Sequence, residues 1–224
     1  MPALPLIPLT PLILQREASI FAREECVHAE PLLFGVDNGK TIGTYIEQKF
    51  RNYLGSRYTT TEGNAAKGID FPDLNIDVKT TSQQQPQSSC PFRSARQKVF
   101  GLGYSLLVFV YAKTDDHERR TATLFITHTL YIEAHATGDY TMTRRLREML
   151  NDGANQEDLV AYMMDRNLPV DDIEAHAIAS ELLAAAPAQG YLTISNALQW
   201  RLQYGRAIQV AGGVPGVLDL GDTP

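Results

Sequence analysis

The segment Tyr104–Lys113, YSLLVFVYAK, is the feature that most restricts how this chain can fold. It is an unbroken apolar run of strand length, without the alternation that marks a strand with one face in water. Such a strand has to be covered on both faces. Residues 121–132, TATLFITHTLYI, follow the charged turn TDDHERR and are expected to form its neighbour. The pair predicts the centre of a sheet that lies between other layers of structure.

Helical patterns precede and follow these strands. Residues 41–55 place apolar side chains at helical spacing and stop at a glycine, and the pattern is helical again from about Tyr140, including SNALQWRLQYGRA at 195–207. Between them we expect a hairpin of IDF and NIDVKTT, a long polar loop at 81–92 and a short helix within 93–103. This order predicts an α/β fold, a mixed β-sheet core flanked by helices, with a helical elaboration at about 140–210.

The length of the chain suggests one domain, and its opening segment suggests an extended arm. A chain of 224 residues is long enough for one well-buried core, so residues 1–224 are predicted to form a single domain. Its opening, MPALPLIPLTPLIL, repeats proline and has no basic residue before the apolar run. This argues against a secretory signal, and residues 1–16 are expected to form an extended arm.

Composition narrows the class of protein. No apolar run approaches the roughly 18 residues of a membrane span, so no membrane role is expected. Two cysteines without a CxxC pattern predict neither a disulfide framework nor a zinc site, and a reducing cytoplasm fits best. The net charge of −6 argues against a general nucleic-acid binder, unless bound metal offsets several carboxylates.

The stretch GIDFPDLNIDVKTTS brings two aspartates together in an unusual way. If PDLN is the hairpin tip, Asp70 and Asp77 stand opposite each other, and like charges in that position destabilise a sheet. A divalent cation between the carboxylates reverses this, and carboxylate oxygens with waters suit Mg²⁺. Lys79 lies two residues after Asp77 and therefore on the same face. There it can orient or help deprotonate an attacking water, or stabilise negative charge on a phosphate. The alternative is a solvent-exposed strand on which the two charges merely interact.

An Asp followed by Asp-x-Lys on the next strand resembles the motif of the PD-(D/E)xK nucleases. The first acid of that motif falls on Asp70, in preference to Asp73 at the hairpin tip, and the rest falls on Asp77 and Lys79. Glu47, on the preceding predicted helix, matches a glutamate that many members carry. The resemblance covers roughly residues 41–113. It implies that Mg²⁺ is held by Asp70, Asp77 and Glu47, and that Lys79 positions the attacking water.

The resemblance implies a restriction-endonuclease-like fold and a type II restriction enzyme, a Mg²⁺-dependent endonuclease that cuts double-stranded DNA at a specific site. We expect a homodimer, because two-fold symmetry lets two identical sites cut both strands of a palindrome. GVDNGKT is one residue short of a phosphate-binding loop, so no nucleotide cofactor is expected. A structure-selective repair or recombination nuclease of the same fold and a catalytically silent DNA-binding module remain alternatives.

The polar segment after the presumed catalytic strand supplies candidate DNA contacts. Gln bonds adenine bidentately and Arg bonds guanine, while Arg and Lys also contact phosphates. A surface loop without function is the alternative for any one of these side chains. The candidates are Gln83, Gln84, Gln85, Arg93, Arg96 and Lys98.

Overall fold

The computed structural model describes residues 6–60, 69–90, 93–195 and 200–221. Their contacts divide the chain into two compact units. The first unit comprises residues 1–86, 105–132 and 211–224, and the second comprises 87–104 and 133–210. The sequence predicted one domain with a helical elaboration. The predicted elaboration lies in the second unit, which has its own apolar core and also takes in residues 87–104. The prediction of a single domain stays a prediction.

The first unit is built on a mixed sheet, which confirms the predicted fold class. Its strand order is β10 (Val217–Asp219), β7 (Thr121–Ile132), β6 (Ser105–Asp116) and β4 (Ile76–Ser82). β4 pairs in parallel with β6, and the other pairs are antiparallel. β2 (Ala29–Glu30) also pairs with β7. β4 is therefore an edge strand, and β6, whose residues 106–110 are fully buried, is central as predicted.

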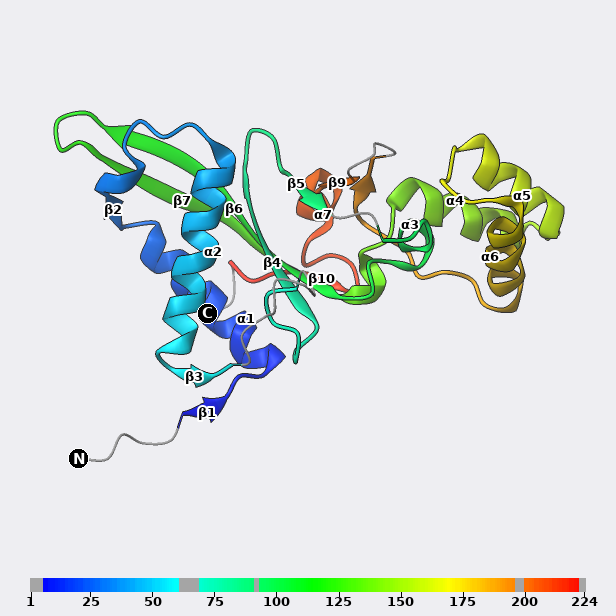
Figure 1. Cartoon of the computed structure of the whole chain (residues 1–224), viewed down its shortest axis with the longest axis horizontal. Coiled ribbons are helices and arrows are strands. Elements are labelled where there is room, and N and C mark those ends of the chain that lie inside the picture. The colour runs from blue at the N-terminus through cyan, green and yellow to red at the C-terminus, as the bar shows by residue number, and fades with distance from the viewer. Residues whose placement is uncertain (1–5, 61–68, 91–92, 196–199, 222–224) are drawn as a thin grey trace. The chain divides into compact units, whose positions relative to one another are not determined.

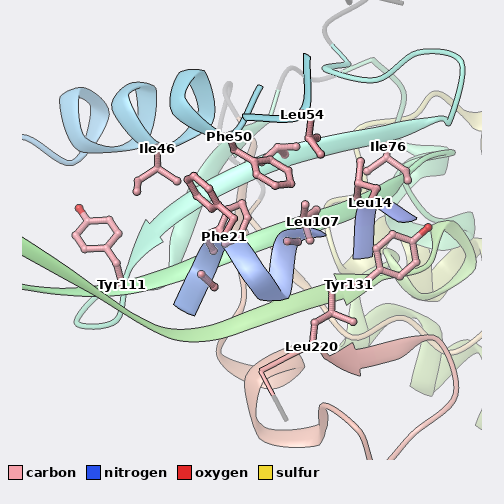
Figure 2. Packing of buried hydrophobic residues seen from close by; sticks show 14 of the residues in the cluster. Leu14, Phe21, Ile46, Phe50, Leu54, Ile76, Leu107, Tyr111, Tyr131 and Leu220 are labelled. Carbon is pink, nitrogen blue, oxygen red and sulfur yellow. The ribbon is translucent and has the colours of Figure 1, made fainter. Parts of the chain in front are cut away.

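Two helices pack on this sheet, α1 (Pro11–Glu25) and α2 (Gly39–Gly55), as Figures 1 and 2 show. Phe21 of α1 and Phe50 of α2 pack against Phe109 of β6, and the three ring centroids lie 5.0 to 5.6 Å apart. All three rings are buried. Tilted and edge-to-face contacts of this kind add to the free energy gained from burying the rings. The core thus fixes α2 above β4.

The predicted extended arm at residues 1–16 is wrong from Pro11 onward. Thr10 accepts a hydrogen bond from the Ile13 amide and caps α1, with Pro11 at the first helical position. Thr-Pro is a helix-start signal, which the abundance of proline obscured. β1 (Ile7–Pro8) does lie extended against β3 (Tyr58–Thr59). Residues 1–5 of the predicted arm lie outside the described part of the chain, as do residues 61–68.

The second unit contains most of the predicted helices. α4 (Tyr140–Asn151), α5 (Gln156–Asp165) and α6 (Asp172–Ala184) surround a buried cluster that includes Leu146 and Ile178, and the short α3 (Arg96–Phe100) joins them. A 3-10 turn at Ala134–Ala136 precedes α4 in this unit, and another at Pro31–Leu33 precedes α2 in the first unit. None of the described helices is long and apolar enough to cross a membrane.

The second unit also holds a small sheet that the sequence did not predict. β5 (Gln87–Cys90) and β8 (Thr193–Ile194) both pair antiparallel with β9 (Trp200–Gln203), and α7 (Gly205–Val210) follows. Over its described residues, 81–90, the predicted loop is therefore a strand end, a bend and a second strand. Residues 91–92 lie outside the described chain. The predicted helix at 195–207 is wrong at β9, where burial alternates with the period of a strand. Residues 196–199 of that prediction lie outside the described chain.

Candidate active site

β4 places Asp77 and Lys79 side by side on one face of the sheet. The Lys79 Nζ lies 2.7 Å from the Asp77 Oδ2. The Asp77 side chain is only 4% exposed and that of Lys79 21% exposed. Because both charges are largely withdrawn from water, the interpretation as a solvent-exposed strand face does not hold. An ion pair in such a position needs further partners to offset the loss of hydration.

The free edge of β4 positions two more carboxylates. The Val78 amide donates to the Asp70 Oδ2 at 3.0 Å, and the Thr80 amide donates to the Glu47 Oε1 at 3.0 Å. Amides at a sheet edge have no strand partner, so they are available to side-chain acceptors. The edge thus serves as a template that fixes one oxygen of each carboxylate beside the Asp77 and Lys79 pair.

The turn before β4 differs in part from the predicted hairpin. Residues 69–71 form no strand, and a single antiparallel bridge joins Phe71 to Ile76. Asn75, with φ of 56°, closes the turn in the left-handed region that asparagine tolerates. The bridge still places Asp70 at the register predicted for it, next to Asp77. Asp73 at the turn is exposed.

Burial and mutual repulsion change the acidity of these groups. Burial raises the pKa of Glu47 to about 7, with Lys79 opposing the rise and Asp70 adding to it. Burial likewise raises the pKa of Asp77 to about 6, again against the effect of Lys79. Burial opposes protonation of Lys79, but the neighbouring carboxylates outweigh it and raise its pKa. Lys79 is therefore an ammonium, a hydrogen-bond donor rather than a base.

Arg51 is a residue of this cluster that the sequence analysis missed. Its Nη1 lies 3.2 Å from the Asp70 Oδ1, and its Nη2 donates to the Gln48 Oε1. Arg51 follows Glu47 by four residues on α2, so both side chains leave the helix on the same side. That spacing is the signal from which the residue was predictable. Arg51 thus orients Asp70 from the solvent side.

Comparison with known proteins identifies the family. The chain matches the family model described as Type II restriction enzyme NspV over residues 8–219. It belongs to this family. A curated relative, Type II restriction enzyme NspV of Nostoc sp. (strain ATCC 29411 / PCC 7524), is 60% identical over 210 residues, which cover 94% of this chain and 96% of the relative. No solved structure matches.

Membership of the NspV family confirms the resemblance to type II restriction enzymes that the motif indicated. Glu47, Asp70, Asp77 and Lys79 are brought together in the first unit, as the motif predicted. Within the described residues, however, no group of three or more His, Cys, Asp or Glu side chains is arranged as a ready metal site. The carboxylates of Glu47, Asp70 and Asp77 do suit a hard divalent cation, because they outnumber the two cations that contact them, Lys79 and Arg51, and leave negative charge uncompensated.

The predicted DNA contacts are not all available at the surface. Gln83, Gln84 and Gln85 are exposed directly after β4, and Arg93 is exposed in the second unit. Arg96 instead forms ion pairs with Glu174 and Glu181 of α6. Lys98 is only 5% exposed, and burial lowers its pKa. The position of α3 explains the difference, since it buries this lysine near the Asp139 carboxylate of the same unit.

Proposed function

We propose that this restriction enzyme family member is a Mg²⁺-dependent endonuclease that hydrolyses double-stranded DNA at a specific sequence. Family membership supports the class of enzyme. The observation that carries the proposal is the buried pair of Asp77 and Lys79 with Glu47 and Asp70 fixed on the adjacent edge amides. No nucleotide cofactor is required in this proposal.

Each side chain has a role that follows from its position. Asp70 and Asp77, with Glu47, would hold the metal ion. When bound, that ion supplies Lewis-acid activation of the phosphodiester and of water. Lys79 donates hydrogen bonds from its ammonium, orients the attacking water and stabilises negative charge on the phosphate. Arg51 holds Asp70 in place. The edge amides of Val78 and Thr80 keep both outer carboxylates oriented before DNA arrives.

The proposal is tested by digesting plasmid and phage DNA with the purified protein, with Mg²⁺ or with a chelator. Discrete fragments that require Mg²⁺ are expected. The Asp77→Asn variant should lose cleavage, and Asp73→Asn, a matched change of an exposed aspartate in the preceding turn, should keep it. Three results would contradict the proposal. A smear would indicate a nonspecific nuclease, and cutting restricted to branched or mismatched DNA would indicate a structure-selective nuclease. DNA binding without cutting would indicate a DNA-binding module.

We further propose that the enzyme acts in the cytoplasm as a homodimer on a palindromic site, with one cut per subunit. Sedimentation equilibrium or light scattering of the free protein tests this assembly directly. A mass twice that of the 24.8 kDa chain is expected. A monomeric mass both with and without its DNA would contradict it.

A further inference from the structure

The small sheet of the second unit has two faces of opposite character. On one face Leu202, Tyr204 and Ile194 are buried, and the Ser88 and Tyr204 hydroxyls lie 2.5 Å apart beneath the strands. On the other face the side chains are all polar. Alternation along each strand assigns them to that face. They are Gln87, Ser89, Thr193, Arg201 and Gln203.

The strand register orders these side chains into two rows. Gln87, Gln203 and Thr193 lie opposite one another across the three strands. Ser89 lies opposite Arg201 in the next row, and the Ser195 Oγ accepts a hydrogen bond from the Arg201 amide. Ser89, Thr193, Arg201 and Gln203 are exposed. The arrangement is a grid of hydrogen-bonding groups held on a regular backbone. We name it the polar sheet face.

The chemistry of the polar sheet face is selective. β5, β8 and β9 contain no Asp or Glu, and they contribute one arginine. Within the part of the chain that the structure describes, Arg201 forms no ion pair with a carboxylate. A merely solvated face of an acidic protein would carry carboxylates as readily as amides. Amide, hydroxyl and guanidinium groups without a carboxylate suit a negatively charged ligand whose polar edges both donate and accept.

Double-stranded DNA is such a ligand, because its phosphates are negatively charged and its base edges in the major groove both donate and accept hydrogen bonds. Arg bonds the O6 and N7 of guanine, Gln bonds the N6 and N7 of adenine, and Ser or Thr bonds either base. Neighbouring strands lie about 4.8 Å apart. The major groove is about 12 Å wide and admits a two-stranded β-ribbon. β9 with one neighbouring strand therefore fits the groove, and the side chains of the face match the chemistry of the base edges.

We propose that the polar sheet face lies in the major groove of double-stranded DNA, and that Arg201 and Gln203 help to determine which sequence is cut. This inference rests on the proposed function, because only a site-specific enzyme needs such contacts. It assigns sequence recognition to residues other than Gln83, Gln84 and Gln85. It also gives the second unit a role in choosing the site, separate from the hydrolysis carried out by Asp77 and Lys79.

The test begins with the wild-type enzyme, whose recognition sequence is mapped by sequencing the ends of its fragments. If no specific cutting occurs, the proposed function fails, and the inference falls with it. If specific cutting occurs, kcat/KM is measured on the mapped site and on sites with one base pair replaced. The ratio of these values is the discrimination that the polar sheet face is expected to provide.

Arg201→Ala and Gln203→Ala should each lower this discrimination roughly ten- to a hundredfold at one base pair. Gln209→Ala, an exposed glutamine of α7 in the same unit, is the matched control and should change nothing. Arg201→Lys separates two kinds of contact. A phosphate contact survives the change to lysine, whereas a bidentate base contact does not, so lysine should retain the salt dependence but not the discrimination.

Unchanged discrimination in both alanine variants would overturn the inference. So would full recovery by Arg201→Lys, which would indicate a phosphate contact. A third contradicting result is that the alanine variants become monomeric in solution while their discrimination stays intact. That result would place the polar sheet face between two copies of the chain. Circular dichroism verifies folding, and anisotropy with labelled cognate and altered duplexes in Ca²⁺ gives the same ratio for any variant that no longer cuts.

Discussion

β4 and β9 are both strands with polar side chains at alternate positions, yet they use them in opposite ways. β4 buries Asp77 and partly buries Lys79, and burial with mutual interaction shifts their pKa values. β9 buries Leu202 between Arg201 and Gln203 and leaves those two polar side chains exposed. The arrangement on β4 lowers the stability of the fold and produces groups with shifted pKa values. The arrangement on β9 lowers the stability little and offers hydrogen bonds to a ligand. The comparison separates catalysis from recognition.

The largest effect should come from breaking the buried pair of β4. Asp77→Asn removes a carboxylate and leaves Lys79 without its ion-pair partner, so kcat should fall roughly a hundred- to ten-thousandfold. Affinity for the recognition site should change little, in contrast to variants of β9. Single-turnover cleavage and anisotropy measure the two quantities. A variant that cuts normally would show that Asp77 has no part in the chemistry.

Changing the buried residue of β9 should affect stability rather than sequence choice. Leu202→Ala removes a fully buried side chain and should cost about 2 to 5 kcal/mol in the free energy of unfolding. Gln203→Ala, its exposed neighbour, should stay within about 0.5 kcal/mol. Urea titration measures both. Equal losses would mean that β9 does not present two different faces.

The pH dependence of stability should reveal the raised pKa of Glu47, whose side chain is partly buried. Its pKa is about 7 in the folded protein against 4.5 for an ordinary glutamate. The folded state therefore binds the extra proton, and this contribution to stability falls as pH rises from about 4.5 to 7. Without metal, Glu47→Gln should be more stable than wild type by on the order of 1 to 3 kcal/mol at pH 8, and equal to it near pH 4.5.

Urea unfolding in chelator at several pH values provides this measurement. Glu24→Gln changes an exposed glutamate of α1 and is the matched control, for which no such pH-dependent gain is expected. A difference between wild type and Glu47→Gln that is constant with pH would contradict the burial of the Glu47 carboxylate. Added Mg²⁺ at pH 8 should stabilise wild type more than Glu47→Gln, since the ion would offset the buried charge.

The smallest effect should come from Arg51, which acts only through Asp70. Arg51→Gln should lower kcat about tenfold and raise the Mg²⁺ concentration needed for half-maximal cleavage, because groups that orient metal ligands have effects of this size. Arg51→Lys should recover part of the loss. Arg119→Gln, an exposed arginine of the turn between β6 and β7, is the control. Unchanged Mg²⁺ dependence in Arg51→Gln would leave this arginine without a positioning role.

Where apolar periodicity was strong, the sequence was sufficient to predict the elements. β6 and β7 follow from continuous apolar runs, and α4, α5 and α6 follow from helical spacing. The proximity of Asp70, Asp77 and Lys79 was also predictable, because two like charges placed opposite each other beside an Asp-x-Lys strand need a reason. Glu47 followed instead from the resemblance to the PD-(D/E)xK nucleases. Local patterns of this kind survive in the folded chain because side-chain direction follows directly from backbone geometry.

The remaining features depend on contacts between distant segments. β5 and β9 are short, polar on one face and far apart in the sequence, so neither shows its pairing locally. Lys98 looks like a surface cation in sequence, but the packing of α3 buries it. The edge amides that hold Asp70 and Glu47 exist only because β4 ends the sheet. The strand pairing, the burial of Lys98 and the free edge of β4 all depend on tertiary contacts, and no periodicity in the sequence indicates them.

The central claim is that the carboxylates gathered around Lys79 become a divalent metal site. Calorimetric titration of Mn²⁺ into wild type, Asp73→Asn and Asp77→Asn at pH 8, in the absence of DNA, tests it most directly. Saturable binding of similar affinity is expected for wild type and Asp73→Asn, with a large loss of affinity for Asp77→Asn. Equal binding by all three proteins, or no binding by wild type, would contradict the claim.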